Sequence, residues 1–310
     1  MDTINGLDFC IYQEQPEFGK LINYKALKAD PLSFRFCWIK SSEGELLPTD
    51  KGAYPVLDFK RQVEGARSVG FEQVNPYHFY YYHVPQGDGK FYILSPQRQA
   101  EAFAASCEGF EFDHPMTDCE DPFVDPFLQW SNTETANVAL AFARKLNLHL
   151  KTYHAEVTKL LGRPDIYTGD WWWKKMANLL LLNGFTHELV WANDYKFIVA
   201  NYTGKEPIVP PGIVREQVIA WQYTSTPKVA IQGIPVGMIG PGLNVDLERW
   251  VGTEAQWNEW VGKAPIPPVE APPEPITLEK LAQQFANLDG RVKKIEALPW
   301  YRQFFPIVDK

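Results

Sequence analysis

Two acidic residues, Asp118 and Glu120, stand two positions apart in the segment HPMTDCEDP (residues 114–122). On a β-strand they point to one face and Cys119 points to the other, because successive side chains alternate. Two carboxyls placed so close push their pKa values apart, so one can hold a proton while the other is ionised. The spacing alone is not specific, since three other pairs repeat it: Glu43–Glu45, Glu111–Asp113 and Asp246–Glu248. The surroundings of the pair therefore have to indicate chemistry.

Short apolar runs that alternate with helical stretches surround this pair. Helices are predicted over 59–70, 95–109 and 135–162, each ending at a glycine suited to a C-terminal cap. Strands are predicted over 6–10, 34–41, 74–80, 112–120, 165–168, 196–202, 219–223 and 244–246. The alternation predicts an α/β fold with a parallel sheet, and eight strands favour closure into a TIM-like (β/α) barrel. Residues 207–246 are poorer in helix, so the barrel is expected to be irregular. A doubly wound open sheet is the alternative, although no glycine-rich phosphate loop supports it.

Polar residues stand where the predicted strands end. In a parallel barrel the active site forms at the carboxyl ends of the strands. Carboxylates can act on a glycosidic oxygen and on a cationic transition state, while aromatic faces stack on sugar rings. A carbohydrate-cleaving site is therefore predicted. Its candidates are Asp8, Glu43, Tyr77, His78, Asp118, Glu120, Tyr167, Asn201, Tyr202, Gln222, Tyr223 and Asp246.

Structural roles are the alternative for several candidates. They are a turn cap for Asp8, an ion pair with Lys40 or a helix cap for Glu43, a hydrogen-bonded core position for His78, rim packing for Tyr77 and Tyr167, and a cap for a helix beginning LERW at Asp246. Trp171–Trp173 could form a stacking platform. Three successive positions cannot share one helix face, so at least one of these tryptophans is expected to pack inward.

The ordered strand-end segments resemble a known family. GLDFC, CWIKSSEG, NPYHF, MTDCED, DIYTG, IAWQYTS and NVDLERW, in that order over about residues 5–252, look like the glycoside hydrolase family 25 muramidases of the phage-lysin type, which are lysozymes built on an irregular (β/α) barrel. The resemblance implies cleavage of the β-1,4 bond between N-acetylmuramic acid and N-acetylglucosamine in peptidoglycan, without a metal or organic cofactor. One departure is KFIVANYTG (196–204), where the family often has a tryptophan.

The resemblance also implies roles by position. Glu120 would be the general acid, and Asp118 would orient the substrate's N-acetyl group so that its carbonyl attacks the anomeric carbon. Asp8 and Asp246 would complete an acidic floor. The residues expected to contact substrate are Glu43, Tyr77, His78, Tyr167, Asn201, Tyr202 and Gln222.

Composition changes after Trp260. Residues 1–262 are predicted to form the barrel, and the proline-dense segment 263–276 reads as a stiff linker. Residues 277–298 are predicted to form a heptad helix whose seam is Leu278, Leu281, Phe285, Leu288, Val292 and Ile295. Three heptads need a partner, which could be a second copy, giving a homo-oligomer through 278–295, or the flank of the barrel. Residues 299–310 form an aromatic tail that is expected to pack on something.

The net charge and the start of the sequence limit which partners and which location are expected. The net charge of −8 argues against binding to nucleic acid or an anionic membrane. The start MDTINGLDFC has no basic and then apolar leader, and no apolar run is long enough to span a bilayer. Synthesis in the cytoplasm, followed by action on peptidoglycan glycan strands after release, is therefore expected. The four cysteines show no metal-ligand spacing and are expected to be buried thiols.

Two other functions remain open at this stage. A catalytically inactive glycan-binding or phage structural protein could retain the barrel, and a hydrolase could act on another N-acetylated glucan such as chitin. The intact set of acids argues against a pure binder, because buried like charges cost stability.

Overall fold

The computed structural model describes residues 3–14, 21–51, 55–85, 91–121, 133–202, 205–225, 231–234 and 245–262. The chain divides into two units, Met1–Ala264 and Pro265–Lys310. The predicted linker, heptad helix and aromatic tail lie outside the described residues, and they stay predictions. Within the described part, no helix has the length and apolar character needed to cross a membrane.

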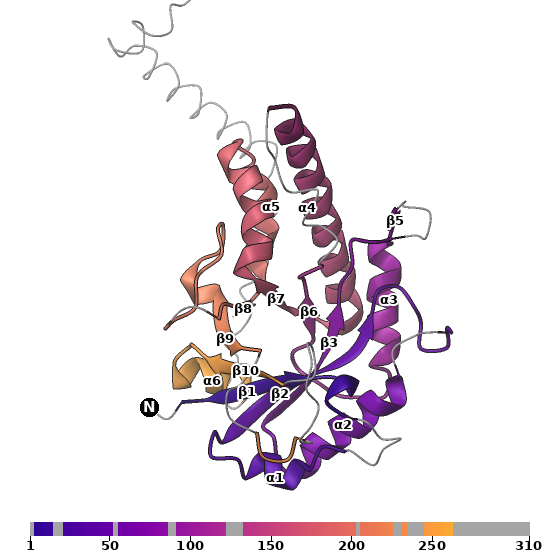
Figure 1. The fold of residues 1–310 in the computed structure, drawn as a ribbon, viewed down its shortest axis with the longest axis vertical. Helices are drawn as coiled ribbons and strands as arrows, with labels where there is room; N and C mark the ends of the chain where they lie inside the picture. The colour runs from indigo at the N-terminus through magenta and orange to yellow at the C-terminus, as the bar shows by residue number, and fades with distance from the viewer. Residues whose placement is uncertain are drawn as a thin grey trace, which may run out of the picture. The chain divides into compact units, whose positions relative to one another are not determined.

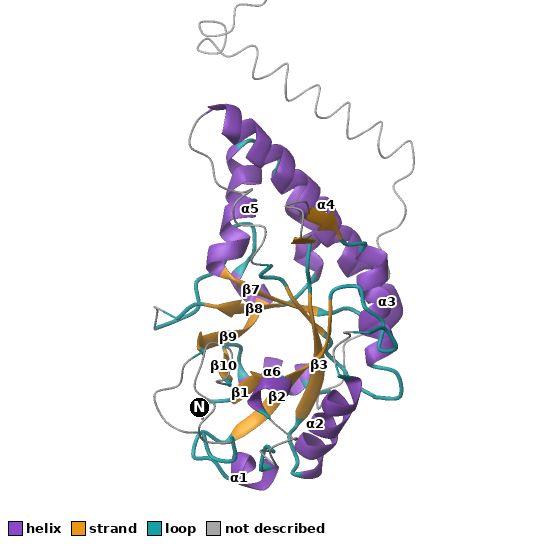
Figure 2. Ribbon diagram, turned by 45° about the vertical axis from the view of Figure 1, so that its right-hand side comes forward, coloured by secondary structure: helices purple, strands orange, loops and turns teal. Residues whose placement is uncertain are grey.

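A closed barrel of eight strands forms the centre of the first unit (Figures 1 and 2). The order around the barrel is β1-β10-β9-β8-β7-β6-β3-β2, which confirms the predicted barrel. Its strands are β1 (Asn5–Phe9), β2 (Phe34–Glu43), β3 (Gln73–Phe79), β6 (Met116–Asp118), β7 (Asp165–Gly169), β8 (Phe197–Ala200), β9 (Val218–Thr224) and β10 (Asp246–Trp250). A separate hairpin, β4 (His83–Pro85) with β5 (Phe91–Ile93), was not predicted.

The last strand corrects the prediction at this end of the barrel. A strand at 244–246 followed by a helix was expected, whereas Asp246–Trp250 form β10, which runs antiparallel to both β1 and β9. Leu247 packs in the outer core and Trp250 packs inside the barrel, so the five residues alternate as a strand does. Because β10 is reversed, its first residue lies at the carboxyl end of the parallel strands, where Asp246 pairs with Asp8.

Helices cover the outside of the barrel, and the three predicted ones are confirmed as α2 to α4. The α-helices are α1 (Tyr24–Lys28), α2 (Val56–Ser68), α3 (Pro96–Ser106), α4 (Thr133–Leu161), α5 (Asp170–Leu182) and α6 (Glu254–Trp260), and the 3₁₀ helices are η1 (Ile11–Gln13), η4 (Thr186–Asp194) and η5 (Arg215–Gln217). Ser95 caps α3 by accepting a hydrogen bond from the Arg98 amide. Gly70 and Gly162 follow α2 and α4 with φ of 81° and 87°, the left-handed conformation that glycine adopts without strain.

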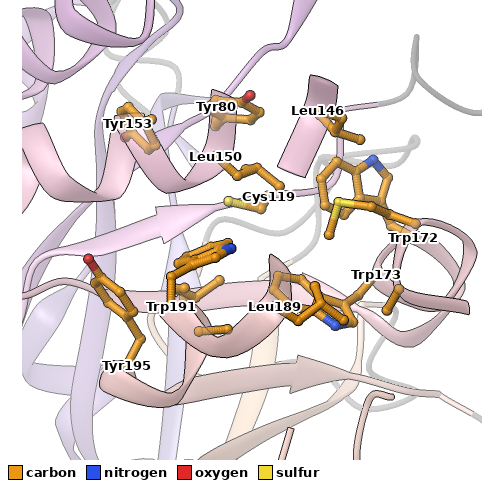
Figure 3. Packing of buried hydrophobic residues seen from close by; sticks show 14 of the residues in the cluster. Tyr80, Cys119, Leu146, Leu150, Tyr153, Trp172, Trp173, Leu189, Trp191 and Tyr195 are labelled. Atoms are coloured by element: carbon orange, nitrogen blue, oxygen red, sulfur yellow. The ribbon is translucent and has the colours of Figure 1, made fainter. Parts of the chain in front are cut away.

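Most of the hydrophobic core lies between the barrel and its helices. Figure 3 shows the part beneath α4 and α5, where Cys119, Leu150, Trp172 and Trp191 lie together. Trp172 and Trp173 are buried while Trp171 is 42% exposed, so the three tryptophans do divide between faces. All four cysteines are buried free thiols, as predicted.

Aromatic side chains fill the amino-terminal end of the barrel interior. Phe36 and Trp38 of β2 pack there with Trp250 of β10 and Trp257 of α6. Gly6 of β1 is required in this layer, because a Cβ at that position would collide with the Phe36 ring. Described side chains therefore fill the interior at this end, and the opposite end is the one where a substrate is expected.

Candidate active site

The acidic pair on β6 faces the interior at the carboxyl end of the barrel. β6 ends at Asp118, but the Cys119 amide still donates to the Tyr167 carbonyl at 2.8 Å, so the extended pairing continues toward Glu120. Cys119 points into the outer core, beside Leu150 and Trp191 (Figure 3). Asp118 and Glu120 therefore share the inward face, as the sequence predicts. The predicted strand 112–120 begins later than expected, at Met116, directly after Pro115.

The register of the sheet brings two more carboxyls to this end. Asp8 is the fourth residue of β1, and its partner across the sheet is Asp246 on the reversed strand β10. Asp8, Glu120 and Asp246 are partly exposed, whereas Asp118 is only 7% exposed. The four residues predicted to be catalytic therefore meet as a floor that solvent can reach.

Burial and mutual repulsion raise the pKa values of the carboxyls in this floor, so they keep their protons to higher pH than free carboxyls do. Burial, and then the charge of Asp8, raise the pKa of Glu120 to about 7, against the Tyr167 hydroxyl and the Lys40 ammonium, which lower it. Burial, and then Asp8 and Glu120, raise the pKa of Asp246 to about 9. Burial and the charge of Glu120 also raise the pKa of Asp118, and Lys40 opposes this rise. Glu120 thus has the pKa best placed for proton exchange near neutral pH.

Gln222 of β9 connects the floor to its aromatic neighbours. Its Nε2 donates to Asp8 Oδ2 at 2.8 Å, and its Oε1 accepts from the Tyr167 hydroxyl at 2.9 Å and from the Tyr202 hydroxyl at 2.5 Å. Tyr202 is 43% exposed, and its ring lies 5.6 Å from that of Trp171. An exposed aromatic pair therefore stands beside the carboxyls, where a sugar ring could stack.

Sequence reasoning missed two residues of the site as functional candidates. Lys40 is a buried cation whose Nζ lies 2.5 Å from Glu43 Oε2 and 4.9 Å from the centre of the Phe79 ring. Glu248 of β10 is buried beneath the floor, against Asp8 and Gln222. Lys40 had been considered only as a partner of Glu43, and that pairing is found. The signal for Glu248 was the alternation in DLERW, which places it on the same face as Asp246.

The structure does not bring every predicted substrate-contact residue to the floor. His78 points outward, where it packs between Phe103 and Tyr153 and its Nδ1 lies 2.9 Å from Ser42 Oγ. Burial lowers the pKa of His78 to about 3, so it is a neutral core histidine. It alternates with Tyr77, which faces the interior but is buried in the aromatic layer. Both positions fit the structural alternatives better than substrate contact.

Asn201 lies next to the aromatic pair and is almost buried. Its backbone carbonyl accepts a hydrogen bond from Trp221 Nε1 at 2.8 Å, and its backbone N–H donates to the backbone carbonyl of Gln222 at 3.1 Å. The backbone of Asn201 thus orders the segment that ends in Tyr202. Of the predicted contact residues, Glu43, Tyr167, Asn201, Tyr202 and Gln222 border the floor, and their contact with substrate stays a prediction.

Comparison with known proteins gives one family match. The model of the family "Glycosyl hydrolases family 25" matches residues 8–232. A solved structure described as that of the CTP1L endolysin is similar, with a TM-score of 0.47 and 14% sequence identity, covering 85% of this chain and 71% of that chain. No curated protein matches the chain at a significant level.

Proposed function

Since this chain belongs to glycosyl hydrolases family 25, we propose that it is a peptidoglycan hydrolase of the endolysin type, which cleaves the β-1,4 bond between N-acetylmuramic acid and N-acetylglucosamine. The observation that carries the proposal is Glu120, a partly exposed carboxyl with a pKa of about 7 beside three other carboxyls. A general acid works best when its pKa is near the working pH. Action on the bacterial wall after release, and an origin in a phage, belong to the same proposal.

The proposed first step uses the two acids of β6 in different roles. The carbonyl oxygen of the substrate's N-acetyl group attacks the anomeric carbon, and the bond to the leaving oxygen breaks. Glu120 gives its proton to that oxygen, which leaves as the hydroxyl of N-acetylglucosamine. Asp118 accepts a hydrogen bond from the acetamide N–H and stabilises the positive charge that develops on the ring formed. Lys40 supports this role, because its charge favours the ionised form of Asp118.

The second step uses Glu120 in the reverse direction. Its carboxylate takes a proton from water, and the oxygen of that water attacks the anomeric carbon and opens the ring. The product is a chain with a reducing N-acetylmuramic acid end, and Glu120 is protonated again. Asp8 serves Glu120 by keeping its pKa high through repulsion.

Mass spectrometry of digested purified peptidoglycan tests this proposal. The wild-type protein should release muropeptides with reducing N-acetylmuramic acid ends, and Glu120→Gln should release 10² to 10⁴-fold less, which is the usual contribution of general acid catalysis. Glu111→Gln is the matched control, because Glu111 has the same acid-x-acid spacing but lies exposed outside the barrel.

Other outcomes point elsewhere. Equal product from the wild type and Glu120→Gln would remove Glu120 from the role of acid. N-acetylglucosamine oligomers released from chitin, without product from peptidoglycan, would indicate the other substrate class. No product from several wall types would favour a glycan-binding protein.

A further inference from the structure

We propose that Glu248 is a positioning residue that carries a proton and donates it in a hydrogen bond to Asp8. Asp8 is thereby held as an oriented carboxylate. The kinetic consequence rests on the proposed function, whereas the location of the proton does not. The argument starts from the place of Glu248 in the sheet.

Glu248 is held between two strands of the barrel. Its partners across the sheet are Gly6 on β1 and Gln222 on β9. Gly6 has no side chain, and the next inward residue along β1 is Asp8. Gln222 Nε2 lies 3.4 Å from Glu248 Oε1 and 2.8 Å from Asp8 Oδ2, so a single amide nitrogen faces both carboxyls. Glu248 is 1% exposed and cannot be solvated by bulk water.

The groups around Glu248 favour its neutral form. Asp8 and Asp246 are acidic and Gln222 is uncharged, while the Cys37 thiol and the Tyr223 phenol lie within electrostatic range. None of these five groups supplies a positive charge. A buried carboxylate beside other carboxyls is strongly disfavoured, and a protonated carboxyl gains an O–H that can donate.

The two carboxyls are affected in opposite directions by their contact. Burial and Asp8 raise the pKa of Glu248, and the hydrogen bond between the two raises it further. The same hydrogen bond lowers the pKa of Asp8 and so limits the rise that burial, the larger effect, causes. These signs are those of a proton that belongs to Glu248 and is shared toward Asp8. In addition, Glu248 Oε2 accepts no hydrogen bond in the described part of the chain, so a proton on this oxygen breaks no existing bond.

The contact between Glu248 and Asp8 affects the pKa of Glu120, the proposed general acid, through the charge of Asp8. The charge of Asp8 is the second cause, after burial, of the raised pKa of Glu120. Glu248 and Gln222 both favour the charged form of Asp8. Glu248 therefore favours the ionised form of Asp8, and the charge of Asp8 favours the protonated form of Glu120.

A stability measurement locates the proton without any assay of activity. Glu248→Gln keeps the shape and a donor but cannot ionise. If folded Glu248 holds its proton, the unfolded wild type gains stability by ionising above about pH 4.3 while the folded form does not. The denaturation midpoint of Glu248→Gln should then rise relative to wild type between pH 4 and pH 7. A relative midpoint that stays flat or falls over this range would overturn the proposal.

Kinetics on peptidoglycan test the positioning role. Glu248→Leu removes the donor, so kcat should fall roughly tenfold or more, the usual loss for a hydrogen bond to a charged group. The pKa of Asp8 should rise and that of Glu120 should fall, which moves the basic limb of the pH profile to lower pH and so narrows the profile. Glu248→Gln should restore both the rate and the width of the profile.

The remaining outcomes are also decisive. A wild-type pH profile in Glu248→Leu, or a narrow one in Glu248→Gln, would overturn the positioning role. If Glu248→Leu does not fold, Glu248→Met takes its place in the comparison. A wild-type protein that is inactive on every wall would end the proposed function but leave the stability result valid.

Discussion

At the scale of single residues, the charge of Lys40 affects the pKa values of more than one carboxyl in the floor. Lys40 is buried, and its charge lowers the pKa of both Asp118 and Glu120. Without it the floor would hold more protons at neutral pH, and Asp118 would lose the charge that its proposed role requires. Glu43 holds Lys40 in place through an ion pair at the end of β2.

Replacement of Lys40 should move the pH profile of the reaction. In Lys40→Met the pKa values of Asp118 and Glu120 both rise, so the acidic limb, set by ionisation of Asp118, moves to higher pH. The basic limb, set by loss of the Glu120 proton, moves in the same direction. The measurement is kcat/KM for peptidoglycan turnover across the pH range, with Lys40→Arg as the control that keeps the charge. A profile of Lys40→Met that coincides with that of Lys40→Arg would contradict this role of the charge.

At the scale of elements, β1 and β2 approach each other inside the barrel in a way that requires a glycine on β1. Gly6 pairs with Phe36 across the sheet, and the ring occupies the space where a side chain on residue 6 would lie. The ring cannot move freely, because Trp38, Trp257 and Trp260 surround it. The aromatic layer therefore depends on this glycine.

A double-mutant cycle tests this close approach. Gly6→Ala should lower the free energy of unfolding by about 1–3 kcal/mol, the usual cost of overpacking a core. Phe36→Leu should also be destabilising, by loss of packing, but the double variant should lose less than the sum of the two. Urea denaturation of the four proteins measures the coupling. Additive losses would show that residue 6 and Phe36 do not compete for space.

The spacing of apolar residues in the sequence was enough to predict those strands and helices that have an apolar face. The strands from β1 to β9 of the barrel and helices α2 to α4 follow from such runs and from their glycine caps. The eighth strand was predicted over 244–246, but its extension to Trp250 was missed, because the inward positions include Asp246 and Glu248 and LERW reads as a helix start. Contacts such as Gln222 with Asp8 join residues 214 positions apart. They depend on sheet register, which a single sequence does not reveal.

At the scale of the whole molecule, the acidic floor opposes folding at neutral pH. The four carboxyls of the floor, and Glu248 beneath them, all have raised pKa values, chiefly through burial. Each carboxyl binds its proton more tightly in the folded protein than in the unfolded chain, so the stability that it contributes is present below its unfolded pKa and is lost as pH rises. The buried histidines act in the opposite sense: burial lowers the pKa of His154 to about 4, so acid below its unfolded pKa favours the unfolded chain.

The variant Asp246→Asn measures how much folding stability the raised pKa of one floor carboxyl costs. The pKa of Asp246 rises from 3.8 to about 9 on folding, so the variant and the wild type should be equally stable near pH 4. Between pH 4 and pH 9 the variant should become progressively more stable than wild type, because each pKa unit corresponds to about 1.4 kcal/mol and Asn cannot ionise. Chemical denaturation at pH 4, 6 and 8 measures the difference, with Glu101→Gln on the exposed face of α3 as the control. An advantage for Asp246→Asn that does not grow with pH would mean that Asp246 is ionised in the folded protein. The alternative result is a stability advantage of Asp246→Asn that grows with pH, together with slower cleavage of peptidoglycan. It would show that the wild-type protein gives up stability to keep this carboxyl in the proposed active site.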